Sequence, residues 1–427
     1  MLLGLLFLVL LAVVHAAHAH PIVRKRAAGN NATAELLSTL QTMGLTKLHD
    51  AFVSHPAILQ TASASPGQKT LLAPSDAAVQ AFPSWATSNA NLFESTLLMH
   101  FLNGSFDLSQ LQAGPRHTVG HSLVTSPAYA NLPGGNGQAV ALYSARAGSK
   151  NRYVQEGVNN DMFIDASTEV GDYFIQPINQ GMTIPGNATF TLGFIGGHQL
   201  LSKMLLADSA LASTIDNMRG STIFAPTTRA LRAYLATSPS NESLSTVIKN
   251  HLVLNRAVYS PLLDGQGSLI SASGQDISFD AGSNTIRLGQ DSAKVTQYDI
   301  MHRGGVIHLI DAVFSSTTLD QARADQAAQS AQASADPYIA GPVSVENAAS
   351  SQGSDVPAGG AARNSTIQAI NAGNSSTSDS GSSSGASKGG GTGSSSSSGK
   401  SSSAGMLGLP AFTLFSAILL PSTLLSL

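Results

Sequence analysis

The chain has 427 residues, a formal net charge of −3 and only 11% charged residues, and it contains no cysteine. The length allows two or three domains, and without cysteine no disulfide framework can form, so each domain must rely on its own apolar core. Beyond the short stretch Arg24 to Arg26, lysine and arginine form no basic run, which argues against nucleic acid as a partner.

Residues 1–19 are typical of a secretory signal peptide. Leu2 to Val14 is almost unbroken apolar sequence, and Ala17-His18-Ala19 has the small residues of a cleavage site. A transmembrane anchor is the alternative, but the apolar run is short for a bilayer. In the tail at 20–32, Lys25-Arg26 is either a dibasic processing site or an ordinary charged pair.

The first predicted domain covers 33–186 and contains a stretch that occurs twice in the chain. Thr70 to Phe82 recurs as Thr222 to Tyr234, 152 residues later and without a gap. In each copy a short apolar strand ends at a proline, which cannot donate to a sheet ladder, and a serine or threonine follows as the expected helix N-cap. A duplicated unit of this size predicts two similar domains in tandem, the second at 190–316.

The remaining patterns place helices before strands in both domains. In domain one we expect helices at 34–40, 45–52 and 91–102, strands at 122–124, 139–142, 162–164 and 173–178, and an enlarged loop or hairpin around 145–160. In domain two we expect helices at 198–207, 209–218 and 242–253, and strands at 268–270, 276–279, 285–288, 294–296 and 306–314. This order predicts an α+β fold in which a helical N-terminal part packs on antiparallel β-sheets.

Three motifs resemble the signatures of fasciclin domains. The first is the duplicated Thr-apolar-apolar-Ala-Pro-Ser/Thr unit, and the second is an apolar helix that ends in histidine, at Leu97–Leu102 and Val247–Val253. The third is a closing strand, seen clearly at Gly304–Val313 and in a weaker form at Tyr173–Asn179. The matches cover residues 33–316, and the resemblance implies two tandem fasciclin-like domains.

His100 and His251 occupy equivalent places in the two copies. The resemblance implies an interaction determinant there, since this part of the fasciclin fold is linked to adhesion. The alternative, which we favour, is a histidine that hydrogen-bonds backbone between helix and sheet. Met99 and Asn250 stand where the family often carries tyrosine, which weakens an adhesive role tied to that residue.

The sequence contains none of the common catalytic or cofactor motifs. There is no His-Glu-x-x-His, Gly-x-Ser-x-Gly, phosphate loop or dinucleotide fingerprint, so we expect no enzyme and no cofactor. His117 and His121 have the spacing of helical metal ligands, but the glycines and proline around them disfavour a helix. His20, the first residue after the predicted signal cleavage, could chelate copper, but Pro21 follows and the fold signals belong elsewhere.

Residues 317–405 are expected to form a disordered stalk, with a marginal helix at 319–335 and a Ser/Gly-rich part from 350. The uncharged, apolar residues 406–427 are typical of a GPI-anchor signal that is removed, and a membrane span is the alternative. The spacer length places the candidate ω-sites at Ser394, Ser395, Ser396, Ser397 and Ser398. N-glycosylation sequons occur at Asn31, Asn103, Asn187, Asn241, Asn364 and Asn374.

The combination resembles fungal fasciclin-like surface proteins, an impression that Asn131 to Gly135 (Asn-Leu-Pro-Gly-Gly) strengthens. It predicts an extracellular glycoprotein, GPI-anchored at the cell surface or transferred to the cell wall. The expected function is adhesion or cell-wall and matrix association, with wall or matrix polymers and surface proteins as partners and the membrane reached through the lipid anchor. The alternative is a carrier that holds a small ligand or lipid in an apolar crevice.

Overall fold

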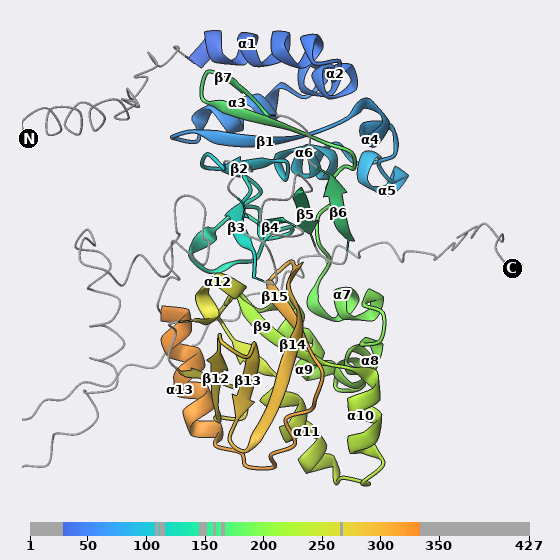
Figure 1. Ribbon diagram of the computed structural model, residues 1–427, viewed down its shortest axis with the longest axis vertical. Helices are drawn as coiled ribbons and strands as arrows, with labels where there is room; N and C mark the ends of the chain where they lie inside the picture. The colour runs from blue at the N-terminus through green and yellow to red at the C-terminus, as the bar shows by residue number, and fades with distance from the viewer. Residues whose placement is uncertain are drawn as a thin grey trace, which may run out of the picture. The chain divides into compact units, whose positions relative to one another are not determined.

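The computed structural model describes residues 29–106, 111, 116–144, 152–156, 159–163, 167–264 and 268–333 (Figure 1). Both predicted domains fall within one compact unit, Met1–Arg363. Four predicted features lie outside the described residues: the signal peptide, the Lys25-Arg26 processing site, the Ser/Gly-rich part of the stalk and the GPI-anchor signal. Among the residues described, none of the helices combines the length and apolarity that crossing a membrane requires.

Domain one begins with three helices that pack around a shared apolar core. They are α1 (Gly29–Thr42), α2 (Thr46–Ser54) and α3 (Pro56–Ala64). Leu36, Leu40, Leu48 and Phe52 recur at helical spacing and are buried, which is why these segments form helices against the sheet. The first two helices were predicted; α3 was not, although a proline at its first position is a normal helix start.

The duplicated unit forms a buried strand and a capped helix in both domains, as predicted. The strands β1 (Lys69–Pro74) and β9 (Ser221–Pro226) are buried along their whole length and end at the prolines. Helices α4 (Asp76–Gln80) and α10 (Thr228–Leu235) follow. The Ser75 hydroxyl accepts from Ala78 N at 3.2 Å, and the Thr227 hydroxyl accepts from Ala230 N at 3.1 Å.

The strands of domain one form two sheets. The first has the order β2-β1-β8-β7, where the new strands are β2 (Phe101–Asn103), β7 (Thr168–Val170) and β8 (Tyr173–Ile178). The second has the order β3-β4-β5-β6, made of β3 (Thr118–His121), β4 (Ala139–Ser144), β5 (Arg152–Glu156) and β6 (Asn159–Phe163). The pair β5 and β6 is an antiparallel hairpin at the place where an enlarged loop or hairpin was expected.

In domain two the described strands form one sheet of seven, ordered β10-β9-β15-β14-β13-β12-β11. The strands of this sheet other than β9 are β10 (Leu252–Leu254), β11 (Ser268–Ile270), β12 (Asp276–Asp280), β13 (Thr285–Leu288), β14 (Asp291–His302) and β15 (Gly305–Ile310). The α+β fold class is therefore confirmed, with helices preceding mainly antiparallel strands in each domain.

One pairing in each domain differs from the antiparallel expectation. Strand β1 pairs with β8 in parallel, from Lys69 opposite Tyr173 to Pro74 opposite Ile178, and β9 pairs with β15 in parallel. Parallel neighbours need a long crossover, and the intervening helix and strands of each domain supply it. The residue pattern within a single strand does not show whether that strand pairs with its neighbour in parallel or antiparallel.

The two histidine-bearing helices end earlier than predicted. Helix α6 (Ala90–Leu98) stops before His100, and α11 (Asn241–Asn250) stops before His251. The apolar residues that follow each histidine belong to the edge strands β2 and β10 instead. Both histidines therefore lie at a helix–strand junction. The predicted strand at 122–124 is likewise displaced, since β3 ends at His121.

Short helices complete the two domains. Helix α5 (Ser84–Thr87) precedes α6, and α12 (Ser260–Leu263) precedes β11. The predicted helices at the start of domain two are present as α8 (Gln199–Ala207) and α9 (Ser209–Asn217), and α7 (Ala188–Phe194) comes before them.

The segment that begins at residue 317 contains a helix at the place where a marginal helix was expected, 319–335. Residues Gln321–Ala333 form helix α13, which lies beside β12 in Figure 1. Arg323 donates to Gly274 O at 2.8 Å and to the Asp276 carboxylate at 2.7 Å, and Asn255 Nδ2 donates to Ala328 O at 2.9 Å. These contacts, together with buried Ala324, supply the tertiary support that the Ala/Gln-rich composition lacks by itself.

Candidate functional site: histidine latches and the domain seam

His100 is completely buried at the junction between α6 and β2. Its Nδ1 is 2.8 Å from the carbonyl oxygen of Thr96, one helical turn earlier. Its Nε2 accepts a hydrogen bond from the backbone N–H of Met182 at 2.9 Å. These partners require a neutral ring with the proton on Nδ1, so the ring joins the end of the helix to the segment that follows the closing strand β8.

His251 repeats this geometry in domain two. Its Nδ1 is 2.7 Å from Val247 O, and its Nε2 accepts from Phe314 N at 3.0 Å, beyond the closing strand β15. The ring also stacks on Phe314 with centroids 5.0 Å apart. We call His100 and His251 the histidine latches, since each ties a helix end to a distant backbone segment.

Burial lowers the pKa of both latch histidines to about 4, although the hydrogen bonds to Thr96 O and Val247 O act in the opposite direction. A protonated ring could not accept the backbone N–H on Nε2, so the hydrogen bonds from Met182 N and Phe314 N also favour the neutral form. His100 and His251 are buried, and their rings contact backbone groups between helix and sheet. The structural alternative explains both.

The two domains meet across an apolar seam. One buried cluster contains side chains from both domains. Domain one contributes residues of β3, β4 and the connection between them, and domain two contributes residues of β14, β15 and the segment before α12. The cluster consists of Val119, Leu132, Ala139, Ala141, Ala257, Tyr259, Met301 and Val306. A continuous apolar core that includes side chains from both domains resists their separation.

A buried carboxylate lies at the centre of the polar part of this seam. Asp299 accepts from Ser260 N at 2.8 Å and from the Ser260 hydroxyl, and it lies 3.1 Å from Nδ1 of His117 in domain one. The backbone N–H of His117 in turn donates to the Ser260 hydroxyl at 3.0 Å. Asp299 has no exposed surface and a positive φ of 56°, so tertiary contacts hold it in a strained conformation.

The charge at Asp299 is stabilised by its partners. Burial by itself would raise the pKa of Asp299, but the hydrogen bond and charge interaction with His117, the charge of His308 and the Ser260 hydroxyl together bring it below its usual value. Burial lowers the pKa of His308, whose Nδ1 accepts from Asp299 N at 3.3 Å. The serine contacts the carboxylate rather than a histidine, so the group lacks the serine–histidine bond of a hydrolytic triad.

The Asn-Leu-Pro-Gly-Gly stretch of domain one forms the other polar contact of the seam. Asn131 Nδ2 donates to Asn217 O and Met218 O, both at 3.0 Å, and Arg219 Nε donates to Leu132 O at 3.0 Å. Gly220 has a φ of +89°, and a Cβ there would lie 2.6 Å from the ring of Pro133. This stretch is therefore a structural contact between the domains.

The sequence did not reveal the seam. Asp299 stands alone between apolar residues of a buried strand, and a charged residue in such a position is seldom buried without partners. That signal was available, but its partners His117 and Ser260 are distant in sequence. His121 Nδ1 lies 2.7 Å from Gly137 O, whereas His117 Nδ1 faces Asp299, so the two rings have different partners. No group of three potential ligands occurs in the described part of the chain.

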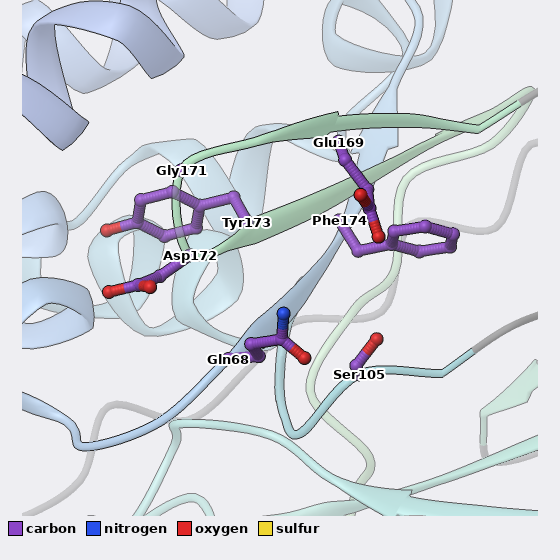
Figure 2. Close-up of a pocket in the computed structure, with 7 residues that line it drawn as sticks. All are labelled: Gln68, Ser105, Glu169, Gly171, Asp172, Tyr173 and Phe174. Carbon is purple, nitrogen blue, oxygen red and sulfur yellow. The ribbon is translucent and has the colours of Figure 1, made fainter. Parts of the chain in front are cut away.

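A shallow depression lies at the turn between β7 and β8 in domain one (Figure 2). It is lined by Gln68, Ser105, Glu169, Gly171, Asp172, Tyr173 and Phe174. Its volume of about 10 Å³ is that of a single water molecule, far below the roughly 300–1,000 Å³ of small-molecule sites. The depression is too small to hold a lipid.

The predicted sequons differ in their surroundings. Asn241 is exposed at the start of α11, and Asn103 is half-buried at the end of edge strand β2 rather than in a turn. Asn187 is the N-cap of α7, where its Oδ1 accepts from Phe190 N at 2.9 Å. Asn31 lies in α1, but its side chain is outside the description, as are Asn364, Asn374 and the ω-site serines.

Comparisons with known proteins agree with the resemblance seen in the sequence. Residues 201–316 match the fasciclin domain model. The fasciclin-like arabinogalactan protein CTB11 of Cercospora beticola is 29% identical over 41% of this chain and 47% of its own length. The fasciclin-like arabinogalactan protein elcF of Phaeosphaeria nodorum is 23% identical over 57% of this chain and 77% of its own. The chain thus spans about half of the first relative and about three quarters of the second.

A solved FAS1 domain pair from the insect cell adhesion molecule fasciclin I aligns with 65% of this chain and 100% of its own, at 16% identity and a TM-score of 0.33. The sequence matches, rather than this distant likeness, carry the assignment. Residues 201–316 therefore match a fasciclin domain, and the chain is similar to fungal fasciclin-like arabinogalactan proteins.

Proposed function

We propose that the protein is an extracellular, cell-surface fasciclin-type protein that acts by binding, in adhesion or in association with the cell wall or extracellular matrix. The observation that carries the proposal is the fasciclin domain at 201–316, together with relatives named fasciclin-like arabinogalactan proteins. The signal-like residues 1–19, the sequons and the GPI-like tail at 406–427 support a surface location and a lipid anchor.

The geometry of the histidines supports binding rather than catalysis. His100 and His251 use both ring nitrogens for backbone contacts, and Asp299 is enclosed with its partners in the seam. An acid–base group needs access to a substrate proton, and these groups have almost no exposed surface. We propose that the chain is not an enzyme and needs no cofactor.

The seam supports a mode of binding in which both domains act together. Buried apolar contacts and the Asp299–His117 pair hold the domains as one unit, so a partner could contact both without ordering a flexible linker. Wall or matrix polymers and surface proteins are the partner classes that we propose. The depression of Figure 2 gives no support to the carrier alternative, because it lacks the volume for a ligand.

The test uses the full chain expressed at the surface of a eukaryotic cell. Phosphatidylinositol-specific phospholipase should release it, and the released protein should bind one or more wall or matrix components on an array. A seam variant, Asp299→Ala, should bind more weakly if both domains contribute. Absence of release would contradict the lipid anchor, and absence of binding to every wall, matrix and surface component would contradict adhesion.

A further inference from the structure

Helix α7, at the start of domain two, carries a pair of exposed aromatic rings. Phe190 is 59% exposed and Phe194 is 60% exposed, and their ring centroids are 4.6 Å apart. The opposite face of the helix is buried through Ala188, Thr189, Thr191 and Leu192, so the two rings point outward by helical spacing. Two phenylalanines in contact form a continuous apolar surface, unlike exposed apolar residues that are scattered singly.

The Phe190 ring lies directly beside a sequon. A Cβ placed on Gly186 would be 2.5 Å from Cδ1 of Phe190, which shows that the ring folds back over the residue before Asn187. This direction follows from helix geometry, because helical side chains tilt toward the N-terminus. Asn187-Ala188-Thr189 is the sequon at that end of the helix.

The hydrogen bonds of Asn187 are compatible with a glycan. Oδ1 accepts from Phe190 N, and Nδ2 donates to the Asp216 carboxylate at 2.9 Å. An asparagine amide has two N–H donors, and glycosylation replaces only one hydrogen. A glycosylated Asn187 therefore keeps its acceptor and one donor, so it can still cap α7 and contact Asp216.

We propose that Asn187 carries an N-glycan whose first sugars cover the Phe190–Phe194 pair. This inference rests on the secretory route assumed in the proposed function. The C–H bonds of a pyranose present an apolar face, and placing that face on the rings removes apolar area of both from water. Helix α7 has no charged side chain, which suits a neutral N-acetylglucosamine. The glycan is thus part of the surface of domain two.

The exposed sequon at Asn241 provides the matched control. It is the first residue of α11, whose N-cap is Ser240 and not the asparagine. None of the exposed large apolar residues described lies in α11; they are Val53, Trp85, Phe190, Phe194, Leu206 and Leu319. A glycan at Asn241 therefore has no aromatic pair on its own helix to cover.

The test begins with glycopeptide mass spectrometry of the full chain secreted from a eukaryotic host. We expect Asn187 to be occupied. Occupancy at Asn241 with none at Asn187 would overturn this inference alone, whereas no occupancy at any sequon would overturn both the inference and the secretory route. The two failures are therefore distinguishable.

A double-mutant cycle then measures contact between glycan and rings. Asn187→Ser removes the sequon but retains a good N-cap residue, and Phe190→Ser with Phe194→Ser removes the rings. We expect Asn187→Ser to lower Tm by about 2 °C more in the wild-type background than in the ring-free background, as a modest coupling would in a unit of this size. Asn241→Ser should lower Tm equally in both backgrounds.

Equal shifts for Asn187→Ser in the two backgrounds would overturn the proposal. A second readout is binding of a hydrophobic dye, which should increase after enzymatic removal of the glycans in the wild type but not in the ring-free variant. If the rings were instead covered by a second copy of the chain, the glycosylated protein would be a dimer that the ring-free variant converts to a monomer. That result would also overturn the proposal.

Discussion

Domain one divides its described strands between two sheets, whereas those of domain two form one sheet of seven. Three features are nevertheless the same in both: the capped strand–helix unit, the parallel pair of first and closing strands, and the histidine latch. The latch partners, Met182 and Phe314, are different residue types, but each offers a backbone N–H. Each latch histidine therefore needs only a backbone N–H from its partner residue, and the side-chain type of that partner does not reveal the contact.

The largest loss of folding free energy is expected at Asp299, the seam carboxylate of β14, which is a feature of domain two. Asp299→Ala leaves the Ser260 N–H without its acceptor and His117 without its partner. Breaking a buried pair typically costs about 3–5 kcal/mol. Chemical denaturation should show domain two, or the whole unit, less stable by about this amount. Asp264→Ala is the control, since its contact with Arg116 is long at 3.5 Å and Asp264 is largely exposed, so little change is expected.

Replacing either latch histidine should lower the free energy of unfolding by a similar amount, although the residues around the two rings differ. His100→Leu and His251→Leu each leave a buried N–H and a buried carbonyl unpaired, at Met182 and Thr96 or at Phe314 and Val247. The expected loss is about 3 kcal/mol in each domain. Glutamine at either position offers both a donor and an acceptor and should recover part of the loss. Unequal losses in denaturant unfolding, with one near zero, would contradict the equivalence of the latches.

Acid should destabilise both domains through the same residues. The folded-state pKa of each latch is about 4, below the ordinary 6.5, so the unfolded chain binds more protons between these values and stability falls as pH decreases. From pH 7.5 to 4.5 the loss is about 2.5 kcal/mol per latch. Asp299, whose pKa is lowered, acts in the same direction at lower pH. Urea unfolding of the His→Gln variants should show a shallower pH dependence; an unchanged slope would contradict this.

Smaller effects are expected at the helix caps. Ser75→Ala and Thr227→Ala each remove the side-chain acceptor of the duplicated unit and should cost about 1 kcal/mol. Ser75→Asp and Thr227→Ser preserve a cap and should be nearly neutral. Thermal unfolding of the four variants would separate loss of the cap from any other effect at these positions.

The smallest effect is expected at α13, a helix with no counterpart among the described residues of domain one. Arg323→Ala removes an ion pair with Asp276 in which both side chains are largely exposed, so its loss should cost about 0.5 kcal/mol or less.

Ala324→Glu, which places a charge at the buried position of the same helix, should detach α13 and increase its amide hydrogen exchange. Unchanged exchange in that variant would contradict the docking of α13.

The sequence predicted features that depend on neighbouring residues. The proline stops and the Ser75 and Thr227 caps are local, because each follows from a residue type within one turn or strand. The latch histidines are local only in the contact that each makes one helical turn earlier, since Met182 and Phe314 are distant in sequence. The direction of β8 and β15, the contacts of Asp299 and the docking of α13 depend on residues far apart in the chain. Nothing in a single sequence indicates that His117 and Asp299, 182 positions apart, are partners.

The docking of α13 has a mechanical consequence. Tension applied through the C-terminal segment reaches domain two at this helix, before it reaches any strand. The load then falls on the packing of Ala324 and on the hydrogen bonds that join α13 to Gly274, Asp276, Asn255 and Lys249, whereas the parallel strands β9 and β15 are buried along their whole length. The helix can peel away while the sheet stays intact. Pulling on domain two from its C-terminal side would therefore release this helix and extend the chain before the sheet unfolds.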